Sequence, residues 1–277
     1  MKKTIRVAQL QTRVLENKLE TIDALEPQMQ RAVQQGAELV CLPEMFCCPY
    51  RSENFPLYAE AEGGPTYLAL RDLAIAFGVY LSAGSVPELG EDGRIYNTAY
   101  VFDRRGNQIA KHRKVHLFDV DIQGGVRFFE SETLSAGNHA TVFDTEFGVM
   151  GLCICYDVRF PELSRQMVDA GAAVILVPAA FNRTTGPAHW ELLFRARAAD
   201  NQAFYVGTSP ALDMRSCYHA WGHSIVTGPW GNVQGQLGDE PGMQMTELNL
   251  DEVQRVRQEL PLLQHRRPEV YQTPPKS

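Results

Sequence analysis

Short apolar runs alternate with longer segments of helical spacing along most of the chain. The apolar runs predict strands at residues 4–10, 38–44, 79–87, 95–103, 147–155, 172–181, 203–211 and 221–229, with one more around 243–250. Apolar positions that recur near every third or fourth residue predict helices at 16–35, 65–77, 161–171, 187–202 and 251–261. This alternation indicates a layered α/β fold.

The sheet is not expected to be purely parallel. The turn sequence RRGN follows the predicted strand 95–103 and leads to a hairpin partner around 107–113. No internal repeat or Pro/Gly-rich linker divides residues 1–277, so we expect one domain. The polar tail, about residues 262–277, is expected to be extended.

Composition argues against several classes of protein. The net charge of −7 gives no support for nucleic-acid binding, which favours basic surfaces. The longest apolar run, residues 172–181, is about half of what a bilayer span needs, so no membrane association is expected. The first residues contain no sustained apolar segment of a signal peptide, and a cytoplasmic location follows as an expectation.

Cofactors are also not expected. The six cysteines lack the spacing of a disulfide framework and are interpreted as reduced thiols. The histidine pairs 112/116 and 219/223 fall in predicted strands or loops without a ligand set beside them, so no metal site is predicted. The nucleotide-binding patterns GxGxxG and GxxxxGK[ST] are absent from the sequence.

Cys155 is the strongest candidate for chemistry. It lies in GLCICYDVRFPEL, where a predicted strand changes directly into a helix start. Backbone N–H groups at such a junction have no intrahelical partner, and they favour a thiolate and an oxyanion. A nucleophile also needs a base and a charge stabiliser. Glu44, after the apolar run ELVCLP, and Lys114, in KHRKVHLFD, are candidates for these roles.

The three motifs together resemble a known family. Glu44 in LPEMF, Lys114 in HRKVHLFD and Cys155 in CYDVRFPEL are similar, in this order, to the Glu–Lys–Cys triad of the nitrilase superfamily of carbon–nitrogen hydrolases. The likeness covers roughly residues 4–271. It implies a four-layer αββα sandwich. It also implies a homodimer or higher homo-oligomer formed through the helices beside the nucleophile, with the C-terminal tail crossing to the partner.

The resemblance also implies roles for individual residues. Cys155 would attack an amide carbonyl and expel ammonia, while Glu44 would transfer the protons. Lys114 and the backbone N–H of Tyr156 would stabilise the oxyanion. Glu130, in VRFFESETLSAG, matches a second glutamate that orients the lysine in relatives.

Position alone leaves some alternatives open. Cys153 shares a face with Cys155 if the strand is regular. Glu132 lies near Glu130, and Lys111 and Arg113 compete with Lys114. The contexts CYDxRF and KxH favour Cys155 and Lys114. For Asp157 and Arg159, we expect an ion pair that shapes the turn rather than catalysis.

Longer stretches are similar to the omega-amidase branch, namely HLFDVDIQGGVRFFESETLSAG, FNRTTGPAHWELLFRARAADNQ, AWGHSIVTGPWGNV and LPLLQHRRPEVY. That branch hydrolyses the terminal amide of 2-oxoglutaramate and 2-oxosuccinamate. The carboxylate of such a substrate needs donors or a cation away from the thiol. Candidates for this binding are Tyr50, Arg159, Arg183, Thr184 and Thr185. Rival hypotheses are a deaminated-glutathione amidase, an N-carbamoyl amidase, a true nitrilase and a non-catalytic scaffold.

Overall fold

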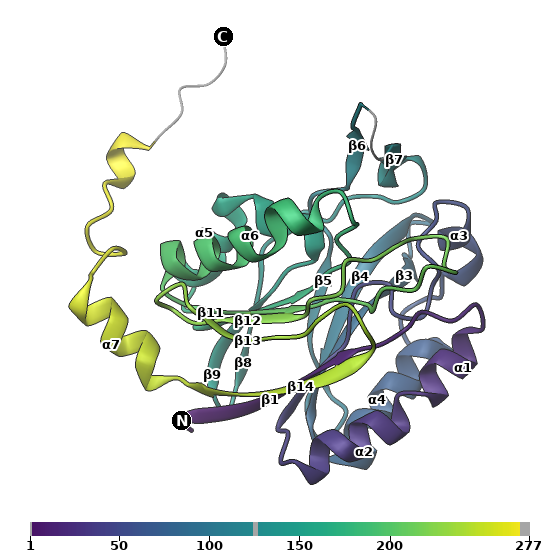
Figure 1. Cartoon of the computed structure of the whole chain (residues 1–277), viewed down its shortest axis with the longest axis horizontal. Coiled ribbons are helices and arrows are strands. Elements are labelled where there is room, and N and C mark those ends of the chain that lie inside the picture. Colours follow the sequence, from purple (N-terminus) through teal and green to yellow (C-terminus); the bar gives the residue numbers. More distant parts are fainter. Residues whose placement is uncertain (1, 124–126, 272–277) are drawn as a thin grey trace.

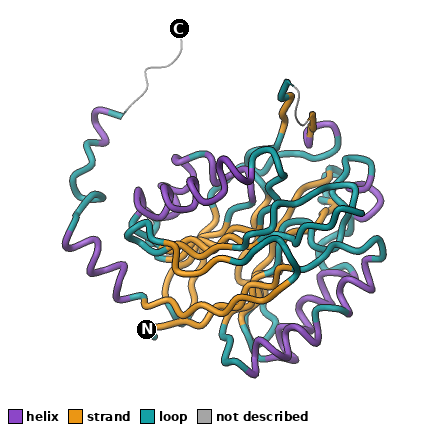
Figure 2. The backbone as a smooth tube through the Cα atoms, viewed as in Figure 1, coloured by secondary structure: helices purple, strands orange, loops and turns teal. Residues whose placement is uncertain are grey.

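Two sheets lie face to face with helices on both outer sides (Figure 1). The structure is a computed structural model that describes residues 2–123 and 127–271. It confirms the expected α/β class and the four-layer αββα arrangement. Figure 2 shows the same layers by secondary structure, with the orange strands between the purple helices.

The first sheet contains six strands. Their spatial order is β14 (Gly242–Asn249), β1 (Thr4–Gln11), β2 (Leu39–Cys41), β3 (Tyr80–Leu89), β4 (Ile95–Phe102) and β5 (Gln108–Arg113). The helices on this side are α1 (Lys18–Asp23), α2 (Glu26–Gln34), α3 (Asn54–Tyr58) and α4 (Pro65–Phe77). The expected hairpin is β4 and β5, which pair antiparallel, whereas β2 is parallel to both of its neighbours.

The second sheet also contains six strands. Their order is β13 (Val233–Gln236), β12 (Ile225–Thr227), β11 (Phe204–Thr208), β10 (Val174–Pro178), β9 (Gly148–Leu152) and β8 (Thr141–Thr145). Helices α5 (Pro161–Asp169) and α6 (Gly186–Asn201) cover its outer face (Figure 1). A two-stranded hairpin of β6 (Asp119–Asp121) and β7 (Arg127–Phe129) projects from the body.

Strand β1 illustrates why both faces of the first sheet are buried. Ile5 and Val7 point into the core between the two sheets. Ala8 and Leu10 belong to a second core between this sheet and its helices. Because side chains alternate along a strand, a nearly continuous apolar sequence supplies both cores at once.

Two of the predicted elements differ from the structure. The predicted helix 16–35 is two helices, because Pro27 in the first turn of α2 has no amide hydrogen for the Asp23 carbonyl. The predicted strand 147–155 ends at Leu152, and a short 3-10 helix, η2, begins at Cys155 (Cys155–Arg159).

Several short elements were not predicted from the sequence: α3, β6, β7, β8 and β13. The C-terminal region contains α7 (Asp251–Glu259) and the 3-10 helix η3 (Pro268–Val270), and residues 272–277 of the predicted extended tail lie outside the described residues. Of the helices within 2–123 and 127–271, none has the length and apolar character for crossing a membrane.

Candidate active site

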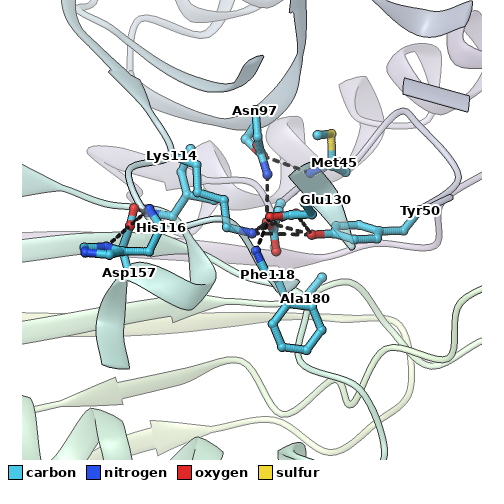
Figure 3. Close-up of polar contacts among 12 residues, drawn as sticks. Met45, Tyr50, Asn97, Lys114, His116, Phe118, Glu130, Asp157 and Ala180 are labelled. Atoms are coloured by element: carbon cyan, nitrogen blue, oxygen red, sulfur yellow. Dashed lines mark hydrogen bonds and ion pairs between the residues drawn. The ribbon is translucent and has the colours of Figure 1, made fainter. Parts of the chain in front are cut away.

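Three charged side chains from separate parts of the chain meet in a fully buried cluster (Figure 3). The Lys114 Nζ lies 2.9 Å from Glu44 Oε1 and 2.9 Å from Glu130 Oε1. Glu44 follows β2, Lys114 comes directly after β5, and Glu130 opens the 3-10 helix η1 (Glu130–Glu132). The structure therefore brings together Glu44, Lys114 and Glu130 without exposed surface, and it places Cys155, the fourth residue that the motifs selected, close enough for Glu44 and Lys114 to act on its thiol.

Two neutral side chains complete this cluster. The Tyr50 hydroxyl is hydrogen-bonded to Glu130 Oε1 and lies 3.2 Å from Glu44 Oε1. The side-chain amide of Asn97 donates to Glu44 Oε1 at 2.8 Å, and the backbone carbonyl of Asn97 accepts from the Lys114 backbone N–H at 2.8 Å. Glu44 Oε1 thus accepts from Asn97 and Lys114, with the Tyr50 hydroxyl also nearby, whereas Glu44 Oε2 is buried without a partner among the described residues. One carboxylate oxygen remains available for chemistry.

Burial and charge act in opposite directions on Lys114. Burial alone lowers the pKa of an ammonium group. The charges of Glu130 and Glu44 outweigh this effect and raise the pKa of Lys114 well above its usual value. Burial raises the pKa of Glu130, although Lys114 opposes the shift. Lys114 is therefore a permanent cation at neutral pH.

Cys155 begins η2 in a backbone conformation that few non-glycine residues adopt. Its φ is 46°, in the left-handed region. Burial, and then the charge of Glu44, raises the pKa of its thiol well above the usual value, against the smaller effects of Lys114 and the Ala180 backbone. The expectation that this junction favours a thiolate is therefore wrong, because burial and, after it, the charge of Glu44 favour the neutral thiol.

Asp157 joins the turn at Cys155 to the segment that carries Lys114. Its Oδ2 accepts from the Ile154 N–H at 3.0 Å and contacts His112 Nε2 at 3.0 Å. Its Oδ1 contacts the N–H and Nδ1 of His116 at 2.9 and 2.8 Å (Figure 3). The expected ion pair between Asp157 and Arg159 is wrong, since Asp157 bonds the two histidines that flank Lys114.

The turn after β2 depends on a glycine beneath it. A Cβ on Gly84 would lie 2.2 Å from the Pro43 carbonyl oxygen, and the φ of Gly84 is +63°. Met45, directly after Glu44, also has a positive φ of 48°, and its N–H donates to Ser85 Oγ at 3.1 Å. Close approach of the two chain segments fixes where Glu44 points.

Cys155 lines a small pocket together with Arg159 and Thr185. We call it the Cys155 pocket, and its remaining lining residues are Tyr50, Phe118, Tyr156, Ala180, Phe181, Asn182 and Tyr218. The space in it that is open to a water-sized molecule is about 10 Å³, which is room for about one water molecule.

Arg159 is a cation with no carboxylate beside it among the described residues. Its guanidinium lies over the rings of Phe181 and Tyr156, at 4.6 and 5.6 Å, and its Nη1 lies 3.1 Å from His189 Nδ1. Its Nε is buried without a hydrogen-bond partner there, and burial lowers its pKa. An anionic ligand would supply the missing partner.

The structure separates the competing residues. Cys153 is fully buried in the largest hydrophobic core cluster, and Glu132 is exposed. Lys111 and Arg113 pair with Glu88.

The structure also sorts the candidates for substrate binding. Arg159, Thr185 and Tyr50 line the Cys155 pocket. Arg183 and Thr184 are exposed and do not line it.

Sequence reasoning missed Asn97, Phe118 and Tyr218 in this region. Asn97 is a buried polar residue inside the apolar strand IYNTAYVF, and that interruption of the pattern was the available signal. The Phe118 N–H donates to Glu130 Oε2 at 2.7 Å, but nothing in the sequence marks a backbone donor. Tyr218 hydrogen-bonds the Ala180 carbonyl and packs against Tyr50, and it comes from a loop without a recognisable pattern.

Comparisons with known proteins agree with this geometry. The family model for carbon-nitrogen hydrolases matches residues 4–258. The chain belongs to the carbon–nitrogen hydrolase family. The resemblance found in the three motifs is thereby confirmed, and the chain is a hydrolase that acts on amides.

Two relatives are similar to this chain over most of its length. Omega-amidase NIT2-A of Xenopus laevis is 46% identical over 244 residues, which is 88% of each chain. Omega-amidase NIT2 of Mus musculus is 43% identical over 269 residues, which is 97% of each chain. The similarity to the omega-amidase branch is therefore also confirmed.

Among solved structures, Nit3 of Saccharomyces cerevisiae superposes with a TM-score of 0.89 at 38% identity, covering 96% of this chain and 98% of its own. An amidase mutant from Nesterenkonia sp. AN1, which shows Michael addition of acrylamide at its active-site cysteine, has a TM-score of 0.75 at 29% identity, with 94% and 98% covered.

Proposed function

We propose that this carbon–nitrogen hydrolase is an omega-amidase that converts 2-oxoglutaramate and 2-oxosuccinamate to the dicarboxylic oxo-acid and ammonia. The observation that carries the proposal is that Cys155 and the unpaired cation Arg159 line one pocket beside the Glu44–Lys114–Glu130 cluster. A thiol, a base and a distal cation match a small amide that also carries a carboxylate. The relatives named omega-amidases support the same assignment.

Acylation begins with proton transfer from the thiol. Because the pKa of Cys155 is raised, its sulfur carries a proton at neutral pH. Glu44 Oε2, which has no other partner, accepts this proton as the sulfur attacks the amide carbonyl. Proton transfer and attack therefore belong to the same step.

The tetrahedral intermediate places a negative charge on the former carbonyl oxygen. Lys114 and the Tyr156 backbone N–H stabilise it, and one such donor is typically worth about 3 kcal/mol. Glu130 holds the ammonium group of Lys114 in place. Glu44 then gives its proton to the leaving nitrogen, ammonia departs and a Cys155 thioester remains.

Deacylation uses the same base. Glu44 takes a proton from water, the water oxygen attacks the thioester carbonyl, and the proton passes to the departing sulfur. The products are the oxo-acid and the free thiol.

Arg159 provides the specificity in this proposal. Its guanidinium binds the distal carboxylate of the substrate, with Thr185 as a further donor in the same pocket. Arg183 and Thr184 lie outside that pocket and have no role in the proposal.

An ammonia-release screen tests this function. The purified protein is offered 2-oxoglutaramate, 2-oxosuccinamate, deaminated glutathione, N-carbamoyl amino acids and aliphatic nitriles, with Cys155→Ala as the inactive control. We expect the two oxo-amides to have the highest kcat/KM. Strong turnover of another class beside negligible turnover of the oxo-amides would reject the assignment.

A second variant tests the specificity. Arg159→Met removes the cation, so kcat/KM for 2-oxoglutaramate should fall about 10–100-fold, the usual loss for a hydrogen bond to a charged group. Turnover of a neutral amide such as propionamide should change little. An equal loss for both amides would show that Arg159 supports the site in another way.

We also propose that the chain forms a single domain and is located in the cytoplasm. We propose further that it assembles at least as a dimer through the surface of α5 and α6. Leu192 on α6 is 63% exposed, and Leu260, Leu262 and Tyr271 near the C-terminus are exposed as well. Leu192→Glu should shift the protein to monomers in sedimentation experiments. A wild type that is already monomeric would contradict the proposed assembly.

A further inference from the structure

A second pocket reaches the candidate active site from the side of Glu44. Glu44 lines its inner part, and Val14, Asp213 and Ser216, which are only partly buried, lie toward the surface. We call it the Glu44 pocket. Three residues line both this pocket and the Cys155 pocket: Tyr50, Ala180 and Tyr218. Cys155 lines only one pocket and Glu44 only the other.

The shared residues form a wall between the two pockets. The rings of Tyr50 and Tyr218 pack with centroids 4.8 Å apart, and the Tyr218 hydroxyl donates to the Ala180 carbonyl at 2.5 Å. The Tyr50 hydroxyl in turn is held by Glu130 (Figure 3). Hydrogen bonds therefore hold both aromatic residues of this wall, Tyr50 and Tyr218, in place.

Glu44 faces both sides of this wall. Its side chain is completely buried and lines the Glu44 pocket, its carboxylate is close enough to Cys155 to raise the pKa of that thiol, and Oε2 has no hydrogen-bond partner among the described residues. A buried carboxylate oxygen needs a donor, and a water or ammonia molecule in the pocket that Glu44 lines would be one.

Charge distinguishes the two pockets where size does not. The space open to a water-sized molecule is about 20 Å³ in the Glu44 pocket and about 10 Å³ in the Cys155 pocket, so each has room for about one molecule of that size. The Cys155 pocket contains the cation Arg159, whereas the Glu44 pocket contains two carboxylates, Glu44 and Asp213. Hydrogen bonds from Arg215 lower the pKa of Asp213 to about 2, so it is ionised at neutral pH. Asp213 is already paired with Arg215 and Glu44 with Lys114, and the residues that line the Glu44 pocket include no cation, so an oxo-acid finds a cationic partner only at Arg159 in the Cys155 pocket.

We propose that the Glu44 pocket is a second opening of the active site, through which ammonia leaves and the hydrolytic water enters. The oxo-acid enters and leaves by the Cys155 pocket alone. The inference rests on the proposed function and adds separate routes for the two kinds of molecule. The thioester can then remain in the Cys155 pocket while ammonia is exchanged for water at Glu44.

The steps balance without a further reactant. Glu44 protonates the leaving nitrogen as the carbon–nitrogen bond breaks, and neutral ammonia departs past Glu44. Water takes its place, gives one proton to Glu44 and forms the new carbon–oxygen bond as the carbon–sulfur bond breaks. The proton on Glu44 then returns to the Cys155 sulfur.

Bulky substitutions at the outer part of the Glu44 pocket test the proposal. Val14→Phe and Ser216→Phe each fill space at partly exposed positions outside the buried cluster. Val142→Phe, at a 38% exposed position that lines neither pocket, is the matched control. Each protein is first compared with the wild type by its thermal unfolding temperature, and the two independent variants guard against the misfolding of one.

The readouts separate the two routes. We expect kcat for 2-oxoglutaramate to fall at least tenfold in Val14→Phe and Ser216→Phe, and the Cys155 thioester to accumulate in the intact-protein mass spectrum. The inhibition constant of the product 2-oxoglutarate should remain within twofold of the wild type, because the product binds in the other pocket. Val142→Phe should match the wild type in all three measurements.

Two results would overturn the second opening. One is a kcat within twofold of the wild type in every folded pocket variant, without accumulated thioester. The other is a raised inhibition constant for 2-oxoglutarate, which would assign the Glu44 pocket to the oxo-acid. A wild type that releases no ammonia from the oxo-amide would instead contradict the proposed function, so the two failures are distinguishable.

Discussion

Two clusters of glutamate and cationic side chains take their cations from neighbouring positions at the end of β5, Lys111 and Arg113 for one and Lys114 for the other, and they differ in one decisive respect. Glu88 accepts from Lys111 and Arg113, and also from Thr98, so both of its oxygens have partners. Its two cations are about a quarter exposed. Lys114, Glu44 and Glu130 have no exposed surface, and Glu44 Oε2 is left without a partner among the described residues.

The comparison shows that residue type alone does not make a reactive site. Glu88, whose two oxygens both have hydrogen-bond partners, connects β3 to Lys111 and Arg113 of β5. A buried carboxylate with one free oxygen, beside a thiol whose pKa is raised, is prepared for proton transfer. Substitutions in each cluster test this difference.

Replacing the oxygen of Glu44 that has no partner should cause the largest loss of activity. Glu44→Gln keeps the shape of the side chain and removes the base, so kcat/KM for 2-oxoglutaramate should fall about 10²–10⁴-fold. Glu88→Gln, the equivalent change in the other cluster, should leave kcat/KM within twofold of the wild type. Steady-state kinetics measure both variants. Similar losses of kcat/KM would show that the two clusters do not differ in their importance for activity.

Removing the ammonium group of Lys114, which contacts both Glu44 and Glu130, should lower both activity and stability. Lys114→Met takes away an oxyanion donor, which should lower kcat about 10²–10³-fold. It also leaves Glu44 and Glu130 buried without their cation, which should reduce the free energy of unfolding by about 3–5 kcal/mol. Urea unfolding measures the second effect, and unchanged stability would contradict the burial of an ionised pair.

The raised pKa of Cys155 predicts slow alkylation. A thiol with a raised pKa becomes a thiolate only as the pH climbs above the range of ordinary thiols. Its reaction with iodoacetamide should therefore still be accelerating at about pH 9, where an unperturbed thiol, with a pKa of about 8.5, approaches its plateau. Peptide mass spectrometry follows Cys155 beside the exposed Cys217. A plateau below pH 7 at Cys155 would indicate a preformed thiolate.

The Glu88 cluster should contribute a modest, pH-dependent stability. Burial raises the pKa of Glu88, but hydrogen bonds from Arg113, Lys111 and Thr98 outweigh it and lower the pKa. A lowered carboxyl pKa stabilises the fold above the unfolded value of about 4.3, and the contribution is lost as the pH falls below it.

Glu88→Gln should therefore reduce the free energy of unfolding by about 1–2 kcal/mol at pH 7. The difference from the wild type should shrink between pH 5 and about pH 3. A difference that grows on acidification would show the opposite sign for the shift.

The layers of the fold were predictable from the sequence, and Glu44, Lys114 and Cys155 could be selected as candidates, because both inferences depend on local patterns. Apolar runs end just before Glu44 and Cys155, and the short motifs around them are distinctive. The break between α1 and α2 was also readable at Pro27.

What escaped prediction depends on contacts between distant segments. Asn97 reaches Glu44 across the sheet, and Asp157 joins two histidines from another strand and loop. The state of the thiol also depends on how close Glu44 lies in space. Arg183 and Thr184 appeared equivalent to Thr185 in sequence, and only the folded loop separates them.

The most direct test of the account is to identify the acylated residue. Wild-type protein is mixed with 2-oxoglutaramate, quenched in acid within milliseconds, digested and analysed by mass spectrometry. The account predicts an acyl group on the peptide that contains Cys155, together with a burst of ammonia equal to the amount of enzyme when deacylation limits the rate. An acyl group on another cysteine, or full turnover in Cys155→Ala, would contradict it.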